Sequence, residues 1–307
     1  MTGIRFGHQI RPAGPIDELI AEARAAETAG FDVVTIPDHI GTTLHSPMIV
    51  ATAIAQATET IRIGTFVLNN EMRNPVQLAW EAATLDRISC GRFELGLGAG
   101  HTPYEFDATG VELQSAATRK ARLFEAVEVI RRLLDGETVT HHGEHYRFNG
   151  AAIEPPDQKR LPILVGGNGK ALATHAGEHA DIVGLTGMGR TLADGHRHAV
   201  KWSLDRLTEQ LHWVACGAAG RPTNPEINVL VQAVEVTNDR ESALAGIAER
   251  AEGLTLEDAR NTPFIAMGTH GEIADQIRSA NERFGIGYFV TRDIEAMAPV
   301  IRQIAGS

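Results

Sequence analysis

Cysteine is scarce in this sequence. The two cysteines, Cys90 and Cys216, lie far apart and form no C-x-x-C pair. Disulfide frameworks and thiolate metal sites need several cysteines at short spacing, so neither is indicated. A Walker phosphate loop is also lacking, because alanine follows Gly169-Lys170 and no glycine stands five residues before Gly169.

Positive charge and long apolar runs are in short supply as well. There are 28 lysines and arginines against 39 aspartates and glutamates, a formal charge of −11, and no basic cluster is longer than a pair. We therefore expect neither nucleic acid nor an anionic membrane as a partner. No apolar run approaches a membrane span, and the N-terminus lacks the pattern of a signal peptide. The expected location is the cytoplasm.

Strand and helix patterns alternate along the chain. Strands are expected at 4–10, 33–36, 61–68, within 91–101, and at 163–165, 182–185, 227–236 and 288–291. Helices are expected at 16–29, 47–57, 75–85, 118–134, 170–179, 192–216, 241–252, 256–260, 270–284 and 294–304, with a hairpin at 138–148. Eight such units predict an α/β fold, a (β/α)8 TIM barrel with insertions. An open Rossmann-type sheet is the structural alternative.

Glycine and polar residues gather where these strands end. The fourth strand runs into glycines at 96, 98 and 100, but the G-x-G-x-G spacing, with no helix directly after it, fits a dinucleotide-binding motif badly. Other strand ends carry His8, Gln9, Asp38, His39, Asn69, Asn70, Gly166–Gly169 and Arg292. In a barrel all of these ends meet at one face, which is where active sites lie.

Several of these segments resemble the bacterial luciferase-like monooxygenase superfamily. The carrying motifs are Ala-Gly-Phe-Asp with Pro-Asp-His39, Ile-Gly-Thr-Phe-Val with Asn-Pro75, Gly91 to Gly100, Leu161 to Lys170, and Met-Gly-Thr with Gly-Ile-Gly-Tyr-Phe-Val near the C-terminus. They follow in order over nearly the whole chain. The resemblance implies a single luciferase-like TIM-barrel domain over residues 1–307. Within the superfamily the sequence is most similar to oxidoreductases that use coenzyme F420, a deazaflavin.

The resemblance also implies roles for individual residues. His39 matches the histidine beside the reactive ring of the coenzyme, with Asp38 in the same turn, and Phe66-Val67 matches a non-prolyl cis peptide that backs the ring. The residues that match the coenzyme site are Asp38, His39, Phe66, Val67, Asn69, Gly98, Ala99, Gly100, Gly166, Gly167, Asn168 and Gly169. Two positions depart from the pattern, because many relatives carry a hydroxyl residue near Ala99 and an acidic or aromatic residue near His101.

The expected catalytic residue is His39. A carboxylate neighbour such as Asp38 tunes a histidine to exchange protons near pH 7. Hydride transfer requires that the coenzyme ring and the substrate are held in position and that one proton is transferred. One histidine and a few backbone donors suffice for this. His101, Glu71, Arg73, Tyr104, Lys170 and Arg292 are further pocket candidates, and each is equally well explained as ordinary loop chemistry. His141, His142 and His145 straddle a hairpin turn without a nearby cysteine or paired carboxylate, so no metal site is expected.

The predicted function is hydride transfer between reduced coenzyme F420 and a small organic substrate. One alternative is an FMN-dependent monooxygenase that needs a flavin reductase, and another is a non-catalytic flavin-binding barrel. A phosphate-sugar lyase barrel usually wants a Schiff-base lysine or a metal set, and neither is evident. Relatives are often dimers, so a homodimer is an expectation, although the residues leave the oligomeric state and the substrate open.

Overall fold

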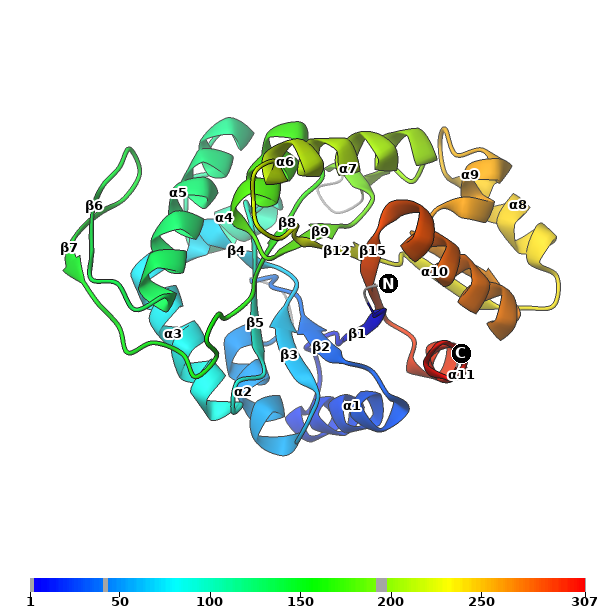
Figure 1. Cartoon of the computed structure of the whole chain (residues 1–307), viewed down its shortest axis with the longest axis horizontal. Helices are drawn as coiled ribbons and strands as arrows, with labels where there is room; N and C mark the ends of the chain where they lie inside the picture. The colour runs from blue at the N-terminus through cyan, green and yellow to red at the C-terminus, as the bar shows by residue number, and fades with distance from the viewer. Residues whose placement is uncertain (1–2, 41–43, 192–197, 307) are drawn as a thin grey trace.

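A closed parallel β-barrel organises the chain in the computed structural model, which describes residues 3–40, 44–191 and 198–306 (Figure 1). Its strands are β1 (Arg5–Gln9), β2 (Val33–Ile36), β3 (Arg62–Thr65), β4 (Leu68–Asn69), β5 (Phe93–Gly98), β8 (Ile163–Gly166), β9 (Ile182–Leu185), β12 (Glu226–Leu230) and β15 (Ile286–Thr291). The pairing of β3 with β5 closes the sheet, and β4 continues from β3 along β5. The expected TIM barrel is therefore confirmed, and the open-sheet alternative is excluded.

Helices cover the outside of the barrel (Figure 1). They are α1 (Ile16–Ala29), α2 (Pro47–Ala57), α3 (Pro75–Ile88), α4 (Pro103–Thr109), α5 (Ala116–Leu134), α6 (Lys170–His179), α7 (Leu204–Ala218), α8 (Arg240–Arg250), α9 (Leu256–Asn261), α10 (His270–Phe284) and α11 (Ile294–Ala305), with a 3-10 turn η1 (Asn70–Met72). Their bounds follow local signals. Pro75 begins α3 in the first turn, and Thr269 and Glu272 form the capping box expected at the start of α10.

Three two-stranded sheets stand outside the barrel. The expected hairpin is present as β6 (Val139–His142) and β7 (Arg147–Ala151), and it projects from one edge of the molecule beside α5 (Figure 1). A second hairpin pairs β10 (Met188–Thr191) with β11 (His198–Val200), and β13 (Ala233–Val236) pairs in parallel with β14 (Ile265–Gly268). These are the insertions in the barrel.

The prediction of a single long strand at 227–236 is wrong. The chain follows β15 up to Val231, whose N–H binds the carbonyl oxygen of Val290. The next N–H, of Gln232, binds the carbonyl oxygen of Phe264, so the strand changes partner and continues as β13 outside the barrel. An apolar run shows that a segment is extended, but it does not show which neighbour the segment pairs with.

The helix expected at 192–216 is wrong at its N-terminal part. Residues 198–200 form β11, and α7 begins at Leu204 because the Ser203 side chain caps it by accepting a hydrogen bond from the Arg206 N–H. Residues 192–197, which the same expectation covers, lie outside the described residues.

The amino end of the barrel is closed by ion pairs inside it. Arg5 binds Glu94 at 2.8 Å and Glu226 at 2.5 Å, and Arg62 binds the same Glu94 at 2.6 Å. The Arg5 guanidinium lies 4.4 Å from the ring centre of buried Tyr288. Charged and aromatic side chains therefore fill this end of the barrel.

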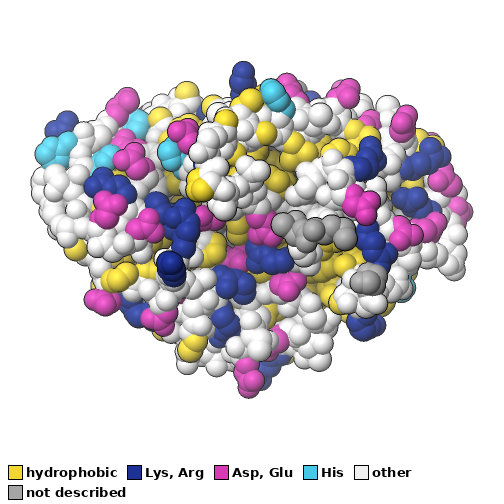
Figure 2. All heavy atoms as spheres, viewed as in Figure 1, with side chains coloured by type: hydrophobic (Ala, Val, Ile, Leu, Met, Phe, Trp, Pro, Cys, Tyr) yellow, Lys and Arg dark blue, Asp and Glu magenta, His cyan; other side chains and the backbone are white. Residues whose placement is uncertain are grey.

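On the face shown in Figure 2, acidic and basic side chains are interspersed with apolar and uncharged ones. Among the described residues, no helix combines the length and the apolar content that crossing a membrane requires.

Glycine at position 96 is required by the contact between β5 and β3. A Cβ built there would stand 1.8 Å from the Thr65 carbonyl oxygen, whereas one built at Gly287 would meet its nearest atom at 3.5 Å. We expect Gly96→Ala to lower the free energy of unfolding by about 1–3 kcal/mol or more. Gly287→Ala is the matched strand control and should change it by less than about 1 kcal/mol. Urea unfolding measures both, and equal losses would contradict this account.

Candidate functional site

The carboxyl ends of the barrel strands open on a cavity of about 630 Å³. This volume lies in the range of small-molecule sites. The cavity is lined by every residue assigned above to the coenzyme site: Asp38, His39, Phe66, Val67, Asn69, Gly98, Ala99, Gly100, Gly166, Gly167, Asn168 and Gly169. Turns that are distant in sequence therefore meet at one place. Their role in binding stays a prediction.

The Phe66-Val67 segment forms the inner wall of the cavity. Its peptide bond is cis, as the resemblance implies. A Cβ at Gly98 would lie 2.6 Å, and one at Gly166 2.9 Å, from methyl groups of Val67. The glycines at these two positions thus make room for Val67. The resemblance assigned them to the coenzyme site, and the packing of Val67 is a reason for glycine that lies within the protein itself.

Gly169 differs from these glycines, because a Cβ built there would meet no atom within 4 Å. It is the N-cap of α6, and no side chain caps the helix at that end. The first-turn N–H groups of a helix carry partial positive charge and suit an anion. The neighbouring Asn168 is held from behind, since its side chain donates to Thr186 Oγ1 at 2.8 Å and its carbonyl oxygen accepts from Arg206 at 2.7 Å.

Asp38 is a buried structural anchor beside the cavity. Its carboxylate accepts a hydrogen bond from the Asn69 N–H at 2.9 Å and forms an ion pair with Arg73. Both partners follow β3, so Asp38 ties the turn after β2 to the turn after β4. Arg73 compensates the charge of this carboxylate. Asp38 affects the pKa of His39 through its negative charge and not through a hydrogen bond to the ring.

The carboxylate that contacts His39 is Glu105, which the sequence analysis missed. The Nδ1 atom of His39 and Oε1 of Glu105 are 2.6 Å apart, and the Glu105 side chain is only 4% exposed. Asn69 donates to the other carboxylate oxygen at 3.3 Å. Glu105 comes from α4, a short helix that was not expected. The available signal was Pro103, which begins a helix, with an acid one turn after His101.

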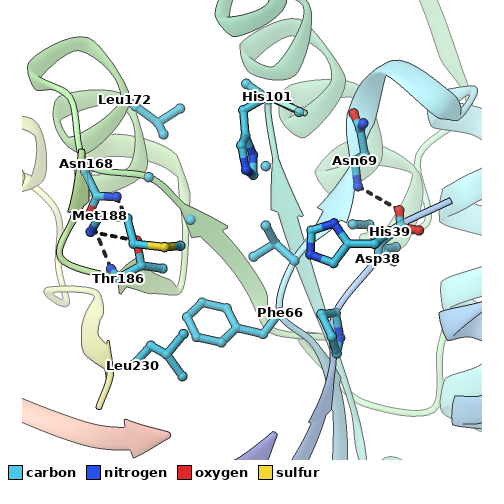
Figure 3. A pocket seen from close by; sticks show the side chains of 18 of the residues that line it. Asp38, His39, Phe66, Asn69, His101, Asn168, Leu172, Thr186, Met188 and Leu230 are labelled. Atoms are coloured by element: carbon cyan, nitrogen blue, oxygen red, sulfur yellow. Dashed lines mark hydrogen bonds between the residues drawn. The ribbon is translucent and has the colours of Figure 1, made fainter. Parts of the chain in front are cut away.

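The pKa of His39 is raised above its ordinary value, and the main cause is the hydrogen bond that its ring donates to the Glu105 carboxylate. Partial burial of the ring opposes the shift, while the negative charges of Glu105 and Asp38 add to it. His39 is therefore biased towards the imidazolium form. Figure 3 shows the rings of His39, His101 and Phe66 pointing into the cavity, with Asn168 and Thr186 on the opposite wall.

The further pocket candidates divide into two groups. His101 and Arg292 line the cavity, whereas Tyr104 and Lys170 lie outside its lining. Glu71 turns away and pairs with Arg122 of α5 at 3.0 Å.

Two of the polar strand ends also face away from the cavity. His8 binds Glu22 of α1 at 2.6 Å, and Asn70 binds the Tyr146 hydroxyl at 3.2 Å. Alternation of side chains along a strand explains the first case, because Gln9, the next residue, lines the cavity.

Two of the hairpin histidines have local partners. His141 binds Glu125 of α5 at 2.8 Å, and His142 binds Asn149 at 2.8 Å. Within the residues that the structure describes, no group of three or more metal-binding side chains is found.

Comparisons with known proteins agree with this architecture. The family model described as luciferase-like monooxygenase matches residues 1–286. An F420-dependent glucose-6-phosphate dehydrogenase of Mycobacterium avium (strain 104) is 36% identical over 185 residues, which cover 57% of this chain and 55% of the relative. A 5,10-methylenetetrahydromethanopterin reductase of Methanolobus tindarius is 35% identical over 181 residues, 58% of this chain and 52% of the relative. The chain thus spans about half the length of the curated relatives it matches.

A solved structure extends the likeness of fold to nearly the entire chain. It is a coenzyme F420 dependent tetrahydromethanopterin reductase from Methanopyrus kandleri, with a TM-score of 0.78 at 20% identity, and 99% of each chain is covered.

The His39–Glu105 pair predicts a measurable titration. We expect NMR to give His39 a pKa above the ordinary value of about 6.5, and Glu105→Gln to lower it, because a neutral amide no longer favours the imidazolium while burial still opposes it. Glu112→Gln removes an exposed acid that does not contribute to the shift of the His39 pKa and should leave that pKa unchanged. Since the folded pKa is raised, the stability that the pair adds is full below the unfolded pKa and is lost as pH rises through the folded one. A pKa of His39 that is the same in wild type and Glu105→Gln would refute the assignment.

Proposed function

Because this chain belongs to the luciferase-like monooxygenase family, we propose that it is an oxidoreductase that transfers a hydride between coenzyme F420 and a small organic substrate. The observation that carries the proposal is that all the residues matching the coenzyme site line one cavity, in a chain whose curated relatives include enzymes named as F420-dependent. On this proposal residues 1–307 act as one barrel domain.

The cavity suits a planar ring with an anionic tail. The apolar side chains of Phe66, Val67 and Leu230 form its inner wall, where a ring can lie flat. Open space at Gly169 and the uncapped start of α6 suit the phosphate of the tail. When bound, a deazaflavin supplies a ring carbon that accepts or gives a hydride.

The protein's own part in the reaction is to position the reactants and to manage one proton. Glu105 holds the His39 ring through Nδ1, and His39 is the residue that would exchange a proton with the substrate. A raised pKa shifts His39 towards its protonated form, which suits proton donation when a substrate is reduced. The ion-paired Asp38 keeps the turn that carries His39 in place.

An FMN-dependent monooxygenase is the rival in the same family, and a non-catalytic flavin-binding barrel is the other alternative. The glycine turns do not separate them, because both coenzymes carry a phosphate and a flat ring. Binding and turnover do, since a monooxygenase consumes oxygen and needs a reductase, whereas a storage barrel binds without turning over.

We predict saturable binding of coenzyme F420, followed by its fluorescence, and much weaker binding of FMN. Gly169→Val should reduce F420 affinity by about tenfold or more, because its side chain would fill the space left for the tail. Gly271→Val, at another position where a Cβ meets no atom, is the control for the substitution itself. Tight FMN binding with no F420 binding would overturn the choice of coenzyme. Full reductase activity in the His39→Ala variant would contradict a catalytic role for His39.

We also propose that the protein is a homodimer. A groove of about 540 Å³ runs between α2 and α3 on the outside of the barrel, and three large apolar side chains at its rim are exposed: Ile40 at 48%, Ile49 at 70% and Trp80 at 60%. Protruding and hollow apolar surface on one face is self-complementary, which is what a two-fold interface needs.

Sedimentation velocity over a range of concentrations tests the dimer. Trp80→Glu should shift the protein to monomer, because it would bury a charge without a partner in the interface. Leu113→Glu, which changes an apolar residue that is 40% exposed outside the groove, should leave the dimer intact. A wild-type protein that sediments as a monomer at every concentration would refute the proposal.

A further inference from the structure

Arg292 is a cation that the proposed coenzyme site does not use. It follows β15 and lines the cavity. Its Nε donates to Oε1 of Gln9 at 2.8 Å, and the described residues show no ion pair for it. The pKa of Arg292 is lowered, with withdrawal from water as the cause and no carboxylate to offset it. An anionic ligand would stabilise a guanidinium that is partly buried and has no carboxylate partner.

The two carboxylates that line the same cavity are already compensated. Asp38 is paired with Arg73, and Glu105 with His39, so neither carboxylate is committed to Arg292. Lys201 lines the cavity as a further basic residue. The cavity therefore has a surplus of positive charge, although the chain as a whole carries −11. Such a surplus attracts an anionic ligand.

The position of Arg292 around the barrel separates it from the proposed tail site. In the closed sheet the order is β1, β2, β3, β5, β8, β9, β12 and β15, so β15 and β1 stand opposite β5 and β8. The glycine turns at 98–100 and 166–169 follow β5 and β8, whereas Arg292 and Gln9 belong to β15 and β1. The coenzyme tail and Arg292 are thus on opposite sides of the cavity mouth.

Gln9 links Arg292 to the wall against which the ring is expected to lie. It is 8% exposed, and while its Oε1 accepts from Arg292, its Nε2 donates to the Phe66 carbonyl oxygen at 3.3 Å. The bond at Nε leaves the two terminal nitrogens of the guanidinium to bind two oxygens of one ligand group. An oxyanion held there would stand at a set place relative to the Phe66-Val67 wall.

We propose that Arg292, oriented by Gln9, binds the oxyanion of the substrate, so that the substrate is a small organic carboxylate or phosphate. The inference rests on the proposed function, because it assumes that the coenzyme occupies the other side of the cavity. Arg292 is the binding residue and Gln9 is a positioning residue.

The test follows the Arg292 side chain by NMR in protein labelled with ¹⁵N-arginine, with and without coenzyme F420. The probes are propionate, inorganic phosphate and the neutral amide propionamide. Propionate or phosphate should shift the Nε signal of Arg292 with saturation, and propionamide should not. The tighter of the two anions identifies the substrate as carboxylate or phosphate. Saturation by propionamide, or no shift with either anion, would overturn the proposal.

Variants locate the effect, with anion affinity measured by calorimetry. Arg292→Gln should weaken binding by about tenfold or more, because a charge-assisted pair of hydrogen bonds is lost. Gln9→Glu should do the same by presenting a competing carboxylate to Arg292 while the barrel still folds. Arg302→Gln removes an exposed arginine on α11 and is the charge-matched control. An equal loss in Arg302→Gln or Lys201→Gln would mean diffuse attraction and would overturn the assignment.

Coenzyme binding separates this inference from the proposed function. If F420 displaces the anion, and Arg292→Gln weakens F420 binding as much as anion binding, then Arg292 serves the coenzyme and the inference fails. If the wild-type protein binds no F420 while the anion still saturates at Arg292, the proposed coenzyme fails and the anion site stands.

Discussion

The packing of Val67 between Gly98 and Gly166 is the constraint on which the site depends. The chain between β3 and β4 bends into the barrel mouth, and the glycines at the ends of β5 and β8 make room for it. On the other side of the bend, a Cβ at Gly184 would lie 2.7 Å from the Phe66 ring. The strands β5, β8 and β9 thus carry glycine where the Phe66-Val67 segment packs against them. The packing of the barrel strands around Phe66-Val67 therefore determines the shape of the cavity.

Charge compensation determines what the cavity can attract. Its two buried carboxylates are each held by a cationic or protonatable partner, so they serve as supports. The glycine turns offer backbone N–H groups on one side, and Arg292 offers a guanidinium on the other. A molecule with negative charge at two separated places, or two such molecules, fits this distribution better than a neutral one.

Much of the fold could be predicted from local signals, and the failures have a physical cause. Helix bounds at Ile16–Ala29 and Lys170–His179 followed from periodicity and glycine ends, since those signals lie within the segment itself. The change of partner at Gln232 could not, because both halves of 227–236 are extended and apolar in the same way. Glu105 was missed for a similar reason. Its pairing with His39 joins residues 66 positions apart, and the resemblance directed attention to His101 instead.

Asp38 lines both the cavity at the barrel mouth and the groove between α2 and α3, and Arg73 lies on the groove side. The Asp38–Arg73 ion pair therefore lies between the cavity and the groove. A partner seated in the groove would strip water from Arg73, and a drier environment strengthens the field that the pair exerts on its surroundings. His39 is the next residue along the chain. Formation of the dimer would therefore change the pKa of its imidazole.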